Sequence, residues 1–235
     1  MTKGVTFIFL ISFSLISLAT GAQKINDCKF VKLPACNTNL FNKIPDGVRM
    51  VAIDDLPHSS AEHKKSLKKN AYEMKLNGFV KTEKADLFDK IPYDKIPKEI
   101  IDRSLEGKTF HKKLVRIMED KFSILEYQGT LAYNPVTITY FFLIDKGKHI
   151  EFTEAYYRPY GETLDLPKEM INRTVAELPA ILVTNAIEFN GKSRTTLQWA
   201  DNTMYYNLKL YEHKRNHLLE AKLLEIANMI TLNSQ

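Results

Sequence analysis

The chain has 235 residues, of which 44% are apolar and 26% charged, and its formal net charge is +5. The apolar fraction is ordinary for a globular protein, and nine glycines and nine prolines argue against a disordered chain. The basic excess is dispersed apart from one dense cluster, Lys64, Lys65, Lys68 and Lys69. We interpret this cluster as a solvated helix face, and we expect no nucleic-acid partner, because such binding needs a stronger basic stripe with stacking aromatics.

The first 22 residues have the pattern of a cleavable secretory signal peptide. Lys3 supplies a short positive region, residues 5–19 form an uncharged, mostly apolar run, and small residues follow. Cleavage is expected after Gly21 or Ala22. A membrane anchor is the alternative, but a spanning helix needs about 20 predominantly apolar residues and this run is shorter. We therefore expect a secreted or periplasmic protein that does not span the membrane after cleavage.

Residues 23–58 are extended and loop-rich, and they contain both cysteines. In an oxidising compartment Cys28 and Cys36 can close a small loop. Metal binding is the alternative, but no further ligand residues flank the pair. The sequence therefore predicts a disulfide that tethers this segment, and it predicts no metal and no cofactor.

The first predicted helix covers residues 61–77. Ser59 and Ser60 offer an N-cap before it, and Gly78 ends it. Its apolar stripe is thin, so we expect the helix on the surface. A second, short helix is predicted over residues 97–107, where a proline suits the first turn.

From about residue 109 the pattern changes to strands rich in β-branched and aromatic residues. Four strands are expected, at residues 114–118, 122–128, 137–144 and 149–157. Gly147 lies in the turn between the last two, where a hairpin needs a residue that tolerates positive φ. A helix is then predicted over residues 168–178, which follow Pro167 and end before Pro179.

The last third of the chain predicts an antiparallel meander covered by a helix. The strands are expected at residues 181–189, 192–199 and 203–211, and Asn190-Gly191 is a strong two-residue turn. The closing helix carries four apolar residues at helical spacing: Leu219, Leu223, Ile226 and Ile230. Because the meander needs a covered apolar face, we expect this helix to pack against Trp199 and Leu208.

Two groups of polar residues are considered as candidate metal or catalytic sites. His213 and His217 share a helix face at the spacing of a zinc site, but two adjacent cations between them oppose a metal. Asp54, Asp55 and His58 lie together in a loop-rich region, and we interpret them as turn and helix-capping residues. The sequence therefore predicts no catalytic residue.

The favoured binding site lies at the end of strand 149–157. Glu154 falls on the same face as the apolar Ile150 and Phe152, and a buried carboxylate among apolar neighbours must be paired or protonated. We therefore predict an aromatic-lined pocket with two polar anchors. Its residues are Glu154, Tyr156, Tyr157, Arg158 and Tyr160. The alternative is an internal salt bridge at a sheet edge, or a register that puts Glu154 in solvent.

A long hairpin at residues 137–157 is followed by a Pro-initiated helix. Further on come the turn at Asn190-Gly191, a strand with Trp199, a strand with two tyrosines and a final helix. This order resembles the Mog1/PsbP-like fold of exported α+β domains, over roughly residues 109–230. The resemblance implies an antiparallel sheet flanked by helices and a protein that binds or scaffolds. It carries over no site residue.

The sequence thus predicts one α+β domain over residues 59–235, with an antiparallel sheet, helices mainly on one face and a C-terminal amphipathic helix. The predicted function is an exported, non-enzymatic binding or assembly module whose partner is another protein or a small ligand. The alternatives are an extracytoplasmic enzyme of the hydrolase type, and a protective inhibitor or immunity protein. In a eukaryotic secreted protein, Asn172-Arg173-Thr174 would be a glycosylation acceptor.

Overall fold

The computed structural model describes residues 43–82, 110–122, 126–134, 137–145, 148–157, 163–187, 192–212 and 216–234. The signal peptide, the Cys28–Cys36 pair and the helix expected at 97–107 lie outside these residues, so those predictions stay predictions. Within the described ranges, no helix is long and apolar enough to cross a membrane.

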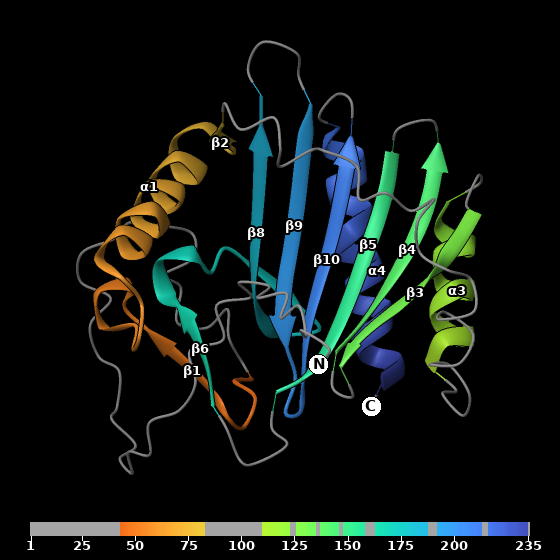
Figure 1. Ribbon diagram of the computed structural model, residues 1–235, viewed down its shortest axis with the longest axis horizontal. Helices are drawn as coiled ribbons and strands as arrows, with labels where there is room; N and C mark the ends of the chain where they lie inside the picture. The colour runs from red at the N-terminus through yellow and green to blue at the C-terminus, as the bar shows by residue number, and fades with distance from the viewer. Residues whose placement is uncertain are drawn as a thin grey trace, which may run out of the picture.

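A large mixed sheet with mostly antiparallel strands forms the centre of the fold (Figure 1). Its strand order is β2-β8-β9-β10-β5-β4-β3, and β7 pairs with β8. The strands are β2 (Val80–Lys81), β3 (Glu126–Asn134), β4 (Thr137–Asp145), β5 (Lys148–Tyr156), β7 (Arg173–Val175), β8 (Leu178–Ala186), β9 (Ser193–Ala200) and β10 (Met204–Glu212). The β2–β8 pair is parallel and the other pairs of this sheet are antiparallel. The predicted α+β class, the hairpin of β4 and β5, and the C-terminal meander are confirmed.

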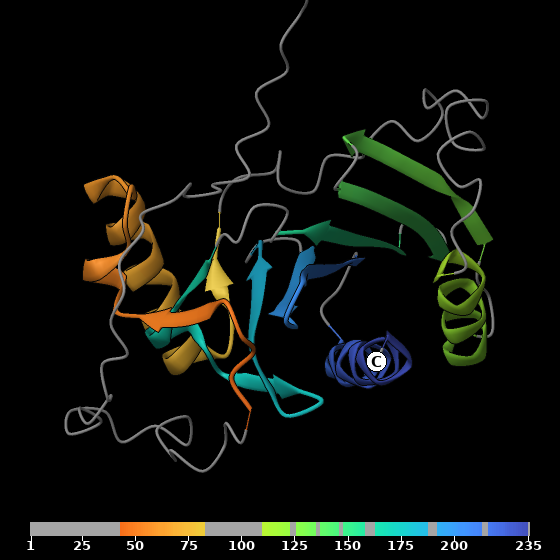
Figure 2. The ribbon, with the colours of Figure 1, turned by 90° about the horizontal axis from the view of Figure 1, so that it is seen from below.

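Two helices, α3 (Phe110–Lys121) and α4 (His217–Ser234), lie on the same side of this sheet (Figure 2). The apolar residues of α4 at helical spacing are fully buried in the main core: Leu223, Ile226, Ala227 and Ile230. Trp199 and Leu208 of the sheet belong to the same core, and the indole Nε1 of Trp199 donates a hydrogen bond to Thr231 Oγ1 at 2.8 Å. The predicted docking of the C-terminal helix is confirmed.

A second layer covers the β8 end of the opposite face. It consists of α1 (Ala61–Asn77), the 3₁₀ turns η2 (Ile53–Asp55) and η5 (Lys168–Met170), and two parallel strands, β1 (Val48–Val51) and β6 (Leu164–Pro167). Ile53, Leu166 and Met170 of this layer pack in a second core with Ile181 and Ala200 of the main sheet. Both faces of the sheet therefore carry an apolar core, and helices cover the sheet only in part.

The paired strands β1 and β6 are joined by a fork-shaped ion pair. Arg49 donates to the carboxylate of Asp165 through Nε, at 2.7 Å, and through Nη2, at 2.8 Å. This hydrogen bonding raises the pKa of the Arg49 guanidinium above its ordinary value. The planar match of guanidinium and carboxylate fixes the position of one strand on the other.

Helix α1 has the bounds that the sequence predicts. Ser60 Oγ accepts the backbone N–H of His63 at 3.1 Å, and Gly78 adopts a φ of 72° at the other end. No residue of α1 is buried, which confirms its predicted place on the surface. Only a thin stripe, including Leu67 and Ala71, packs against the second core.

Three segments differ from the sequence-based expectation. The strand predicted at 122–128 is displaced toward the C-terminus, because α3 runs to Lys121 and β3 begins at Glu126. The predicted strand at 114–118 is the middle of α3, in which Leu114 and Met118 are fully buried in the main core. The predicted helix at 168–178 is instead η5 followed by β7, which turns directly into β8. Ala176 and Glu177 form this turn with φ of 46° and 70°, and the side chain of Asn228 on α4 accepts the Ala176 N–H at 2.6 Å. The contact with α4 therefore holds a turn that has no glycine.

Candidate functional site

The sequence-predicted site residues do not all lie on one face of the sheet. Glu154 lies on the face of α3 and α4, where its Oε1 accepts the hydroxyl of Tyr140 at 2.9 Å. Tyr156, with 39% of its surface exposed, follows on the same strand. Tyr157 is buried in the second core on the opposite side, and its hydroxyl donates to the backbone oxygen of Asp201 at 2.8 Å. Arg158 and Tyr160 lie outside the described residues, and a ligand site at this segment stays a prediction.

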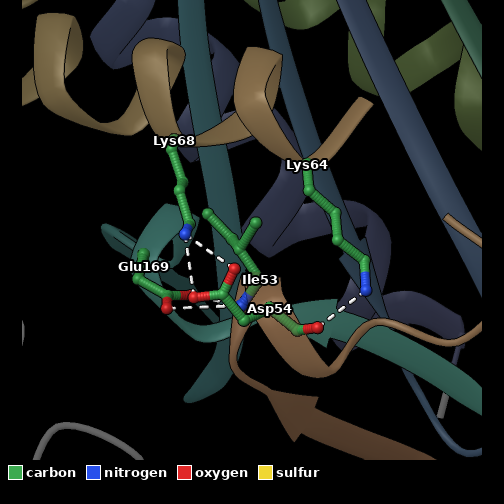
Figure 3. Close-up of polar contacts among 5 residues, drawn as sticks. All are labelled: Ile53, Asp54, Lys64, Lys68 and Glu169. Atoms are coloured by element: carbon green, nitrogen blue, oxygen red, sulfur yellow. Dashed lines mark hydrogen bonds and ion pairs between the residues drawn. The ribbon is translucent and has the colours of Figure 1, made fainter. Parts of the chain in front are cut away.

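Two of the other sequence candidates, Asp54 and His217, have side-chain contacts. Asp54 lies beneath α1, where Lys68 pairs with its carboxylate at 2.6 Å and Lys64 donates to its backbone oxygen at 2.7 Å (Figure 3). Glu169 accepts the neighbouring Ile53 N–H at 3.0 Å. His217 Nδ1 lies 3.1 Å from Glu220 Oε2, whereas His213 is outside the described residues. Among the residues that the structure describes, no three His, Cys, Asp or Glu side chains are grouped to hold a metal.

A cluster that the sequence analysis did not single out lies on the sheet face opposite α4. We call it the polar face. It consists of His149 and Glu151 on β5, Arg194 and Thr196 on β9, and Asn207, Lys209 and Tyr211 on β10. Strand alternation explains the division, because the residues between them, such as Phe152 and Leu208, point into the main core. On the three neighbouring strands, most of these polar side chains lie directly across from one another in the strand register.

A buried carboxylate lies at the centre of the polar face. Glu151 is only 2% exposed, and it stands directly across from Lys209 in the β5–β10 register. Lys209 Nζ lies 3.0 Å from Glu151 Oε2 and keeps 28% of its side chain exposed. A buried charge needs such a partner to offset the loss of hydration. The Glu151 carboxylate is therefore buried on the sheet, while part of its partner, the Lys209 side chain, is exposed to solvent.

Tyr211 lies between two basic neighbours. It faces His149 on one adjoining strand and Arg194 on the other. Its ring stacks on the imidazole with centroids 4.2 Å apart and planes 14° from parallel. Burial, followed by the nearby Glu151 carboxylate, raises the pKa of the Tyr211 phenol above its ordinary value, and Arg194 partly opposes this. The phenol therefore stays protonated at neutral pH and acts as a hydrogen-bond donor.

Two polar atoms of this face have no hydrogen-bond partner among the described residues. They are Arg194 Nε and Asn207 Oδ1, and both atoms are buried although their residues are partly exposed. Buried polar atoms in proteins are seldom left unpaired. Arg194 and Lys209 also bring two positive charges against the single carboxylate of Glu151. Counting only the described residues, the face therefore has an excess of positive charge, one unpaired donor and one unpaired acceptor.

Comparison with protein-family models, with curated proteins and with solved structures finds no match to this chain.

Proposed function

We propose that the protein is an exported, non-enzymatic binding module that takes an anionic ligand on its polar face. The observation that carries this proposal is the buried, unpaired Nε of Arg194 beside a local excess of positive charge. An oxyanion, whether carboxylate, sulfate or phosphate, would supply the missing acceptor and balance the charge. Guanidinium groups are suited to this task because their planar donors match the geometry of such anions.

The neighbouring groups support binding more than catalysis. Tyr211 keeps its proton, because burial raises its pKa, so it is unsuited to act as a base near neutral pH. Glu151 is held by Lys209, which leaves it poorly placed to take a proton from a substrate. Arg194, Thr196, Asn207 and Lys209 are the partly exposed members of the face, and a ligand would reach them first.

The proposal is tested by titrating the protein with inorganic phosphate, sulfate and citrate in a calorimeter. We expect at least one anion to bind, and Arg194→Gln to weaken binding roughly 10- to 100-fold, the range of a lost charge-assisted hydrogen bond. Arg173→Gln is the matched control, since Arg173 is an exposed arginine on β7 outside the polar face. It should bind as the wild type does.

Two outcomes would refute the proposal. One is that none of the three anions binds the wild type at millimolar concentration. The other is that Arg173→Gln weakens binding as much as Arg194→Gln, which would mean that net charge, and not the polar face, attracts the anion.

A further inference from the structure

One side of helix α1 carries a row of exposed side chains. We call this row the basic stripe: Lys65, Lys68, Lys69, Tyr72, Lys75 and Leu76, all of which are exposed. Their spacing of three and four residues places them on one side of the helix. Tyr72 and Leu76 are each 66% exposed, one turn apart, with lysines around them. Two acidic residues border the stripe: Glu62, which is exposed three positions before Lys65, and Glu73, which pairs with Lys69.

The underside of α1 explains why this stripe is preformed. Leu67 and Ala71 pack against the second core, and the helix is capped at both ends. Lys64 and Lys68 also hold its first half to η2 (Figure 3). The stripe therefore lies on a helix that is already fixed to the domain, so binding requires no folding of the helix.

Part of the charge on the stripe is left unbalanced. Lys68 pairs with Asp54, and Lys69 lies 3.6 Å from Glu73. Lys65 and Lys75 form no ion pair with the described residues. Such lysines remain available to an anionic surface, which attracts basic residues close to it.

We infer that the basic stripe docks the protein onto an anionic lipid surface. Lysine amines would meet the lipid phosphates, while Tyr72 and Leu76 enter the boundary between headgroups and acyl chains. The lysine stems can lie along that boundary with their amines in water. A protein partner fits less well, because two isolated apolar side chains between lysines do not make the apolar centre of a protein interface. The stripe is separate from the polar face, so this inference does not depend on the proposed ligand.

The test is co-sedimentation with vesicles of phosphatidylcholine, alone or with about 30% phosphatidylglycerol. The intact mass of the purified protein is first measured by mass spectrometry to show whether residues 5–19 have been removed. If they were retained, this apolar run would bind both kinds of vesicle. We expect binding to the anionic vesicles, and we expect most of it, but not all, to be lost on raising the salt from about 0.05 to about 0.5 M. Lys65→Glu with Lys75→Glu should weaken it about tenfold or more.

The control is Arg116→Glu with Arg173→Glu, which changes the net charge equally at exposed arginines on α3 and β7. It should bind the anionic vesicles nearly as the wild type does. Tyr72→Ala with Leu76→Ala should remove the part of the binding that survives high salt. The inference is overturned if wild-type protein ignores anionic vesicles, if it binds neutral ones equally well, or if the control loses as much binding as the stripe variant.

Discussion

Tyr211 links the protonation of one buried phenol to the stability of the whole fold. Burial raises its pKa above the ordinary 10.0. Below pH 10 the phenol is protonated in both the folded and the unfolded chain, so its contribution is intact. Above pH 10 the unfolded chain ionises first, and the free energy of unfolding falls as the pH rises toward the folded pKa. We expect Tyr211→Phe to make this fall shallower.

The measurement is urea unfolding at several pH values from about 9 to about 11. Tyr72→Phe is the control, because Tyr72 is 66% exposed and lies outside the polar face. An unchanged slope in Tyr211→Phe would mean that the Tyr211 phenol does not remain protonated in the folded protein.

Asn172 is a second residue with a structural task. Its amide donates to the backbone oxygen of Leu182 at 2.8 Å and accepts the Leu182 N–H at 2.9 Å. Asn172→Ala would leave both backbone groups unpaired and should cost about 1–3 kcal/mol. Thr174→Ala removes the same glycosylation motif but keeps the Asn172 contacts, and it should cost less. Because the amide is engaged, we expect no glycan on Asn172, and intact mass checks this.

The residues of the polar face could not be recognised from the sequence with the signals used. Arg194, Thr196 and their counterparts on β10 alternate with core residues, and the same alternation is typical of a solvated sheet face. Whether these polar residues form a cluster depends on the pairing register of the strands. The register brings Lys209 across from Glu151, although the two are 58 positions apart in the chain. Glu154, which the sequence did single out, lies on the same strand but faces the other way.

At the scale of elements, local signals decided what the sequence could predict. Helix α1 has a serine cap and a terminal glycine, and α4 has a regular apolar stripe, so both were predicted correctly. The run Leu114–Met118 is short and apolar, and such runs fit a buried helix as well as a strand. The β7–β8 turn has neither glycine nor asparagine at its two central residues. The turn is held by the hydrogen bond from the Ala176 N–H to the Asn228 side chain on α4. No pattern in the local sequence reveals this contact.

The docking of α4 yields a prediction with a matched pair of substitutions. Leu223 is fully buried, and Leu223→Ala should cost about 2–5 kcal/mol of stability through lost packing and the cavity left behind. Leu218, on the same helix, is 75% exposed, so Leu218→Ala should stay within about 0.5 kcal/mol. Urea unfolding compares the two. Equal midpoints would contradict the packing of α4 on the sheet.

At the scale of the molecule, the proposed export makes two covalent features testable. Because small residues follow the apolar run, the mature chain should begin at Ala22 or Gln23. Intact mass of the exported protein checks this, and a mass that still includes residues 1–20 would contradict it.

The cysteine pair is the second covalent feature. Peptide mapping without reduction should show Cys28 bonded to Cys36 in exported protein, since the compartment is oxidising. Replacing both by serine should lower stability by at most about 2–3 kcal/mol, because the closed loop is short. The sheet should remain folded, as judged by circular dichroism. Two free thiols in freshly isolated protein would rule out the bond.

The parallel pairing of β1 with β6 has a consequence for the order of folding. Arg49 and Asp165, which join the two strands, are 116 positions apart in the chain. Contacts this distant in sequence form late, because the loop between them must close before the contact gives any stability. In a chain exported N-terminus first, β1 has no partner strand until residue 167 has crossed. If the chain is exported as proposed, β1 therefore stays without its partner strand through most of the passage.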